Sequence, residues 1–245
     1  MESFTAYILK TLDRLSREDA RGFTLVEMMV VLSIIVIITV ITLVGQSSFN
    51  RSLVLTDTAY TVAFSIREAQ ALGISSRAFA DGTTNAGYGV RFASAPAGSY
   101  ALFADVHPTK AGNIQNVSVC PGHTVGTGPE ARPGDCRQTQ ASEIVRTYTL
   151  NNGYKVSGFC GNNTGGVEWC NGGNSSSLAA IDITYLRPNT QSVILGTRTN
   201  GAIIVLTNAV IRVSTPAGIE ERCILVSKVG QVSVLSEGVS GCPTK

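Results

Sequence analysis

The sequence predicts an α+β protein: a long N-terminal helix whose second half packs on a mostly antiparallel β-sheet domain. Three observations carry this prediction. Residues 23–44 are apolar, residues 59–73 repeat small and apolar side chains every three or four positions, and residues 86–235 alternate β-rich runs with turns. The chain has 245 residues and a net charge of +2, so it is long enough to bury one core.

The apolar run at 23–44 has 22 residues and one charged side chain, Glu27. As a helix it is roughly 33 Å long, enough to cross a hydrocarbon core of about 30 Å. Four basic residues precede the run, whereas only Arg51 follows before Arg67, so the positive-inside rule predicts a cytoplasmic N-terminus. A plain membrane anchor is the alternative, but a carboxylate inside a membrane segment is costly and requires a functional reason.

The helix is expected to continue past the apolar run and to end at 74–77. From Ala59 to Gly73, the small and apolar positions describe one face of an amphipathic helix. Gly45 and the three polar residues after it are the expected place for a bend or local melting.

Short strands are expected through the rest of the chain, separated by turns. Asn151-Asn152-Gly153 predicts a hairpin between the third and fourth strands. Residues 106–143 and 160–177 are expected to be surface loops, because Gly, Asn, Ser and Thr dominate them. The expected strands are 88–92, 100–103, 144–150, 154–156, 179–186, 192–195, 202–206, 210–214, 223–227 and 231–235.

All six cysteines lie on the predicted outer side, where disulfides persist. Six cysteines allow 15 pairings. Sequential pairing closes the shortest loops and is preferred: Cys120–Cys136, Cys160–Cys170 and Cys223–Cys242. A metal site is the alternative, but no C-x-x-C occurs, and His107 and His123 lack ligand spacing. We therefore expect no metal and no other cofactor.

The segment Gly22-Phe23-Thr24-Leu25-Val26-Glu27 resembles the processing site of type IV prepilins and pseudopilins. The resemblance implies cleavage between Gly22 and Phe23, N-methylation of Phe23, and an assembly role for Glu27. In that role Glu27 neutralises the Phe23 amine of a neighbouring subunit, since paired charges cost less in an apolar bundle than single ones. It also implies a pilin-like organisation: a leader at 1–22, a helix at 23–77 with 23–44 in the membrane, and an extracytoplasmic domain at 78–245.

Residues 222–234 and 66–74 are similar to the final hairpin and helix end of the GspH/FimT/FimU group of minor pilins and pseudopilins. The resemblance implies a structural subunit of a type IV pilus or a type II secretion pseudopilus. Its implied partners are other pilin or pseudopilin subunits, prepilin peptidase, the inner-membrane assembly machinery and, before assembly, membrane lipid. The implied location is the inner membrane, followed by the pilus or the periplasmic pseudopilus.

The alternative function is a pilus-borne binding subunit for adhesion or DNA uptake, with loops 106–143 and 158–177 as the contact surface. Some FimT-like proteins bind DNA through a Gly-Arg-x-Arg turn, but Gly230-Gln231-Val232-Ser233 lacks both arginines, so nucleic acid is not an expected partner. The chain contains no G-x-S-x-G, Walker or H-E-x-x-H motif, and we expect no enzyme activity.

Overall fold

The computed structural model describes residues 22–75, 79, 86–106, 120, 134–172, 177–187 and 190–236. The chain divides into two compact units, Met1–Phe49 and Asn50–Lys245. One helix, α2 (Leu25–Ser75), supplies residues to both units.

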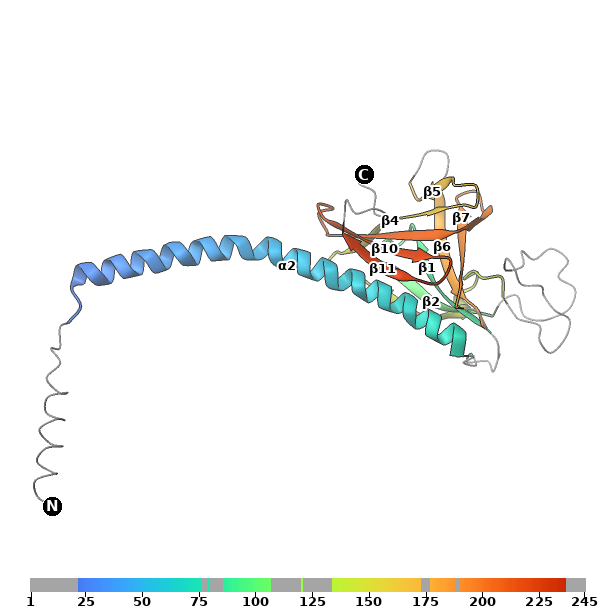
Figure 1. The fold of residues 1–245 in the computed structure, drawn as a ribbon, viewed down its shortest axis with the longest axis horizontal. Helices are drawn as coiled ribbons and strands as arrows, with labels where there is room; N and C mark the ends of the chain where they lie inside the picture. The colour runs from blue at the N-terminus through green and yellow to red at the C-terminus, as the bar shows by residue number, and fades with distance from the viewer. Residues whose placement is uncertain are drawn as a thin grey trace, which may run out of the picture. The chain divides into compact units, whose positions relative to one another are not determined.

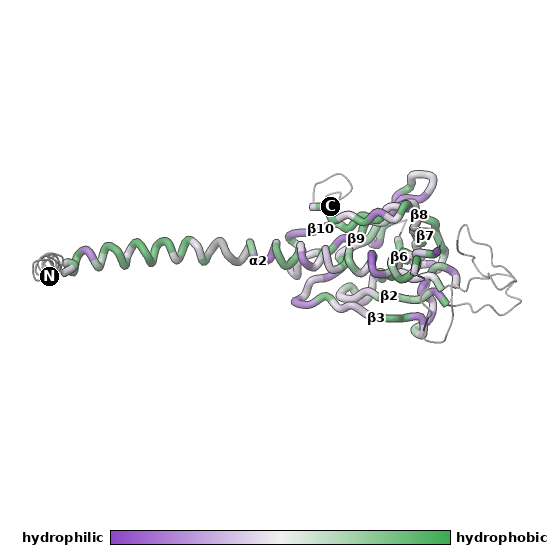
Figure 2. The backbone as a smooth tube through the Cα atoms, turned by 60° about the horizontal axis from the view of Figure 1, so that its bottom comes forward, coloured by the Kyte–Doolittle hydropathy of each residue, from purple (hydrophilic) through white to green (hydrophobic). Residues whose placement is uncertain are grey.

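In the first unit, α2 is apolar on all sides. The stretch Leu25–Leu43 is long and apolar enough to cross a membrane, and Figure 2 shows this half of the helix as almost uniformly hydrophobic. The backbone remains helical from 45 to 48, so the local melting expected there is wrong. A single glycine costs a helix only about 1 kcal/mol, which the helical turns on both sides of Gly45 offset.

The second unit contains two antiparallel sheets, as Figure 1 shows. One sheet has the order β3 (Ile144–Thr149), β2 (Ser99–Asp105), β1 (Gly87–Ala93), β6 (Leu178–Tyr185), β7 (Ser192–Arg198), β8 (Ile203–Leu206). The other has the order β11 (Val232–Ser236), β10 (Glu221–Ser227), β9 (Asn208–Ser214), β4 (Lys155–Asn162), β5 (Glu168–Cys170). A single turn of 3₁₀ helix, η1 (Ala141–Glu143), precedes β3. The predicted α+β class is confirmed.

The second half of α2 packs against both sheets and completes one core. Leu55, Ala59, Val62, Ile66 and Ala69 are fully buried on the face that the periodicity predicts. They belong to the same buried cluster as apolar side chains from both sheets. Because a helix of this kind is stabilised mainly by tertiary packing of its apolar face, the two sheets fix its position in the domain.

The hairpin predicted at 151–153 is wrong, although the turn itself forms. Asn152 and Gly153 have φ values of 58° and 77°, as a tight reversal requires. However, β3 pairs with β2, whereas β4 pairs with β9 and β5 in the other sheet. A turn motif predicts a local reversal, but the burial of Val156 and the strands after it decides which sheet the chain joins.

The loop predicted at 160–177 is also wrong in its first half. β4 continues to Asn162, and β5 returns beside it, with Cys160 opposite Cys170. The Asn163 side-chain oxygen accepts hydrogen bonds from the backbone N–H groups of Gly165 and Val167. The Asn/Gly-rich sequence is therefore a hairpin turn with a side-chain hydrogen bond.

Candidate processing and assembly site

The predicted cleavage site lies in non-helical backbone immediately before α2. Gly22 and Phe23 precede the first helical residue, and both are exposed, Phe23 by 71%. A Cβ atom added to Gly22 would meet nothing within 4 Å. The described chain therefore does not itself require glycine at position 22, and any such requirement comes from the molecule that recognises this segment.

Thr24 caps the N-terminus of α2. Its side-chain oxygen accepts a hydrogen bond from the Glu27 N–H at 3.2 Å, and its carbonyl accepts one from Met28. These bonds satisfy donors that a helix start leaves unpaired. Our sequence analysis missed this role, although Thr-x-x-Glu is the pattern of a capping box.

Glu27 lies in the first turn of α2. A carboxylate at this position interacts favourably with the positive end of the helix dipole. The polar side chains further along the apolar stretch, Ser33, Thr39 and Thr42, each donate to a carbonyl three or four residues earlier. Glu27 is the one charged side chain from 25 to 43, and unlike these hydroxyl groups its carboxylate makes no hydrogen bond within the described helix, so its charge is available to a second molecule.

A family model of the prokaryotic N-terminal methylation motif matches residues 18–43. This is a type IV prepilin-like protein. Such a chain is a substrate of prepilin peptidase and assembles into pilus-type polymers, and its apolar helix fits membrane anchoring before assembly. No curated protein and no solved structure matches the chain.

The prepilin-like chain carries a second apolar surface, on the part of α2 that belongs to the β domain. Leu53, Tyr60 and Phe64 are 52%, 59% and 71% exposed, and their spacing places them along one stripe of the helix. We call these three residues the outer stripe. Our sequence analysis considered the core-facing positions and missed this stripe. The signal for it in the sequence was the pair of aromatic residues four positions apart, Tyr60 and Phe64.

Two tyrosines fix α2 to the first sheet of the prepilin-like chain. Tyr100 and Tyr148 stack at 5.0 Å between ring centroids. The Tyr100 hydroxyl accepts a hydrogen bond from Ser65, and the Tyr148 hydroxyl donates to Glu68 at 2.5 Å. Burial raises the pKa of Tyr100 to about 12, so it stays protonated at neutral pH.

Two of the sequentially predicted disulfides are present, Cys120–Cys136 and Cys160–Cys170. Cys223 is also disulfide-bonded. Its predicted partner, Cys242, lies outside the described residues, as do the loop histidines His107 and His123.

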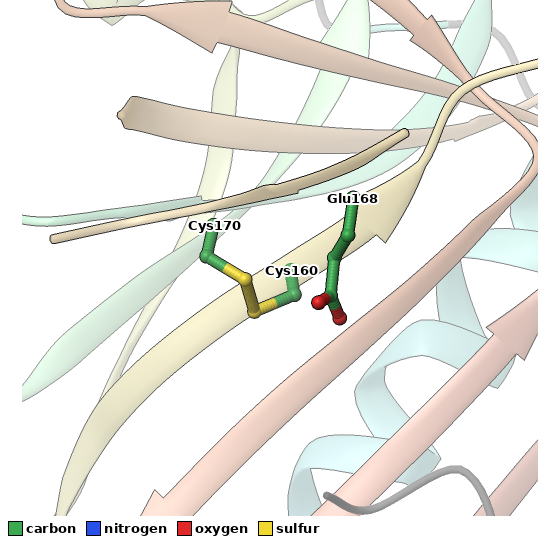
Figure 3. A group of neighbouring side chains, drawn as sticks. All are labelled: Cys160, Glu168 and Cys170. Atoms are coloured by element: carbon green, nitrogen blue, oxygen red, sulfur yellow. A yellow bond between two sulfur atoms is a disulfide. The ribbon is translucent and has the colours of Figure 1, made fainter. Parts of the chain in front are cut away.

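Glu168 lies beside the disulfide of Cys160 and Cys170, as Figure 3 shows. The ligand atoms of these three residues lie within 4.8 Å of one another, a spacing that fits a metal ion. Sulfur binds a metal as thiolate, however, and here the two sulfur atoms are bonded to each other. The group is a disulfide with an acidic neighbour.

A buried carboxylate holds the chain where it returns to the domain after the segment 107–133. Asp105, at the end of β2, accepts hydrogen bonds from the N–H groups of Asp135 and Cys136 at 3.0 and 2.8 Å. A Cβ atom on Gly134 would overlap the Asp105 carboxyl group, so only glycine fits there. Desolvation raises the pKa of Asp105 well above its usual value.

Asp182 of β6 holds the next part of the same returning segment. Its carboxylate pairs with Arg91 of β1 at 2.6 Å and accepts a bond from the Gln138 N–H at 3.3 Å. Burial raises the pKa of Asp182 to about 6, against the opposing effect of Arg91.

Proposed function

We propose that this chain is a minor pilin or pseudopilin, a structural subunit of a type IV pilus or a type II secretion pseudopilus. The observation that carries the proposal is the position of Glu27. Glu27 is the single carboxylate of a helical stretch that is apolar on all sides. It lies in the first helical turn and follows the expected mature N-terminus by four residues.

The proposed assembly step is a charge pairing between subunits. Cleavage after Gly22 creates a positively charged amine at Phe23 within apolar surroundings. The Glu27 carboxylate of a neighbouring subunit neutralises that amine. Breaking such a pair by removing one partner leaves an uncompensated charge in low dielectric, so the pairing sets the stagger between neighbouring helices.

The outer stripe supports the same proposal in the β domain. Leu53, Tyr60 and Phe64 give the helix three exposed apolar side chains that another subunit can cover. The proposal places the N-terminus in the cytoplasm and the disulfide-bonded domain outside it, first at the inner membrane and then in the pilus or periplasmic pseudopilus. The GspH/FimT/FimU resemblance supports a minor rather than a major subunit, and the proposal assigns the chain no catalytic activity.

Substitution of Glu27 tests the proposal. Glu27→Ala and Glu27→Gln should both remain inserted and cleaved, but their ratio of filament-associated to membrane protein should fall at least tenfold. Glu27→Asp should be partly active because it keeps the charge. Glu168→Ala, which removes an exposed carboxylate from the β domain, is the matched control. Equal ratios for Glu27→Ala and the unmodified protein would refute the pairing.

A further inference from the structure

The turn between β9 and β10 is an apolar, exposed tip of the described β domain. Residues 216–219, Pro-Ala-Gly-Ile, are all exposed, and Ile219 is 70% exposed. Contact with a second surface removes an exposed branched apolar side chain from water, which lowers the free energy. A surface that covers this turn would therefore be bound more tightly through Ile219.

The turn lies at the end of the domain where α2 enters it. Arg222, at the start of β10, bonds Ser52 at 3.2 Å, and Arg67 bonds the carbonyl of Val232, which is opposite Val226. Strand β10 and helix α2 therefore run in the same direction, as Figure 1 shows. The turn before β10 consequently projects past Ser52, away from the rest of the domain.

The chain enters this end of the domain shortly after the membrane-crossing stretch in the sequence. Ser52 follows Leu43, the last residue of that stretch, by nine residues, a chain length of at most roughly 30 Å. The opposite end of the domain is remote. Gln70 bonds the Gly230 carbonyl there, and 18 helical residues, roughly 27 Å, separate Gln70 from Ser52.

Four backbone N–H groups of the turn, those of Thr215, Gly218, Ile219 and Glu220, are satisfied within the turn. The Thr215 hydroxyl accepts hydrogen bonds from the N–H groups of Ile219 and Glu220, and the Thr215 carbonyl accepts one from Gly218. The Thr215 N–H donates to the Glu220 carbonyl. A segment with internally satisfied donors enters a lipid interface without leaving those groups unpaired.

Cations flank the turn. Lys155 is exposed and lies opposite Ser214, the last residue of β9, and Arg51 is exposed in the first helical turn of the unit. Arg222 and Glu220 are the half-buried charges beside them. An apolar tip with exposed cations at its margin matches the interface of an anionic phospholipid bilayer.

We infer that the β9–β10 turn rests on the anionic phospholipid surface before assembly, with Ile219 at the boundary between headgroups and acyl chains. The inference rests on the membrane anchorage described above. It makes this turn a lipid contact that is given up when the subunit leaves the bilayer for the filament.

Fluorescence quenching by brominated lipid tests the inference on the full chain in anionic vesicles. Trp169→Phe removes the single native tryptophan, and one tryptophan is then placed by Ile219→Trp, Val229→Trp or Val36→Trp. Val229 is the matched control, because it is 64% exposed, follows Lys228 and occupies a turn at the remote end. Val36 lies within the membrane-crossing stretch and reports anchorage alone.

Brominated lipid should reduce the emission at position 219 at least twofold, leave position 229 unchanged and strongly quench position 36. Lys155→Glu should reduce the quenching at position 219, and no reduction would refute the contribution of the cations.

Quenching at position 219 equal to that at position 229, with position 36 quenched, would overturn the inference while leaving the anchorage intact. An unquenched position 36 would overturn the anchorage itself. A concentration-dependent blue shift at 219 without quenching would assign the turn to a second copy of the chain, which also overturns the lipid contact.

Discussion

Gly73 of α2 lies against the backbone of Tyr185 in β6, so closely that a Cβ atom on Gly73 would be 2.5 Å from the Tyr185 carbonyl oxygen. The absence of a side chain at one helical position therefore sets the distance between the last turn of α2 and the end of β6.

Gly73→Ala should destabilise the domain. At an exposed helical site this change stabilises by up to about 1 kcal/mol, but overpacking here should cost about 1–3 kcal/mol and reverse the sign. Urea unfolding of the full chain in detergent measures the difference. Ala71→Gly, an exposed position two residues earlier, reports the propensity effect alone. A more stable Gly73→Ala variant would show that the helix can move away from the sheet.

Gly22→Val should block cleavage without affecting the fold. A Cβ atom added at this position meets no atom within 4 Å, so the effect falls on recognition by the peptidase. N-terminal sequencing should find the unprocessed terminus in this variant and Phe23 in the unmodified protein. Gly98→Ala, a change at another open glycine, should be processed normally. Full processing of Gly22→Val would contradict the assigned site.

The outer stripe should contribute to assembly but not to stability. Tyr60→Ser and Phe64→Ser together should change the free energy of unfolding by no more than about 0.5 kcal/mol per site, because both side chains are exposed. Cross-linking to neighbouring subunits should nevertheless fall severalfold. Thr61→Ala, on the exposed side of the same helix, is the control. Unchanged cross-linking in the double variant would remove the stripe from the assembly contact.

Asp182 should make the domain less stable as the pH rises from 4 to 7. Its folded pKa of about 6 exceeds the ordinary value of 3.8, so between these values the folded state binds more protons than the unfolded state. The free energy of unfolding therefore falls with rising pH, by roughly 3 kcal/mol in total from this group. The contribution of protonated Asp182 to the free energy of unfolding is fully present below about pH 4.

Asp182→Asn should flatten that slope, because the amide does not titrate. Chemical unfolding at a series of pH values between 4 and 7.5 measures it, with the exposed Asp57→Asn as the control. Asp105 and Asp135 also have raised pKa values, and their share of the slope should remain. Identical slopes for Asp182→Asn and the unmodified protein would refute the assignment to Asp182.

The features visible in the sequence are those with a local cause. The period of α2 follows from one buried face, and strands such as β9 and β10 follow from short apolar runs between turns, so both could be predicted. The site at Gly22, Phe23 and Glu27 is a contiguous motif and was equally visible. The assignment of β3 and β4 to different sheets was not, because a turn carries no information on distant partners.

The buried carboxylates were invisible for the same reason. Asp105 bonds residues 30 and 31 positions later, and Asp182 bonds the backbone of a residue 44 positions earlier. No periodicity or spacing marks such contacts, since each depends on where the first sheet places strands β2 and β6. The outer stripe was a different case, because its aromatic spacing was visible and only its exposure required the structure.

The hydrogen bonds from Asp135 and Cys136 to Asp105 have a consequence for protein engineering. Asp105 at the end of β2 is bonded to the backbone of Asp135 and Cys136, so the two ends of the stretch between them are fixed relative to each other. Doubling the number of residues between two fixed ends costs only about 0.6 kcal/mol of closure entropy. A peptide tag or epitope inserted within residues 121–133 should therefore leave the described sheets unchanged.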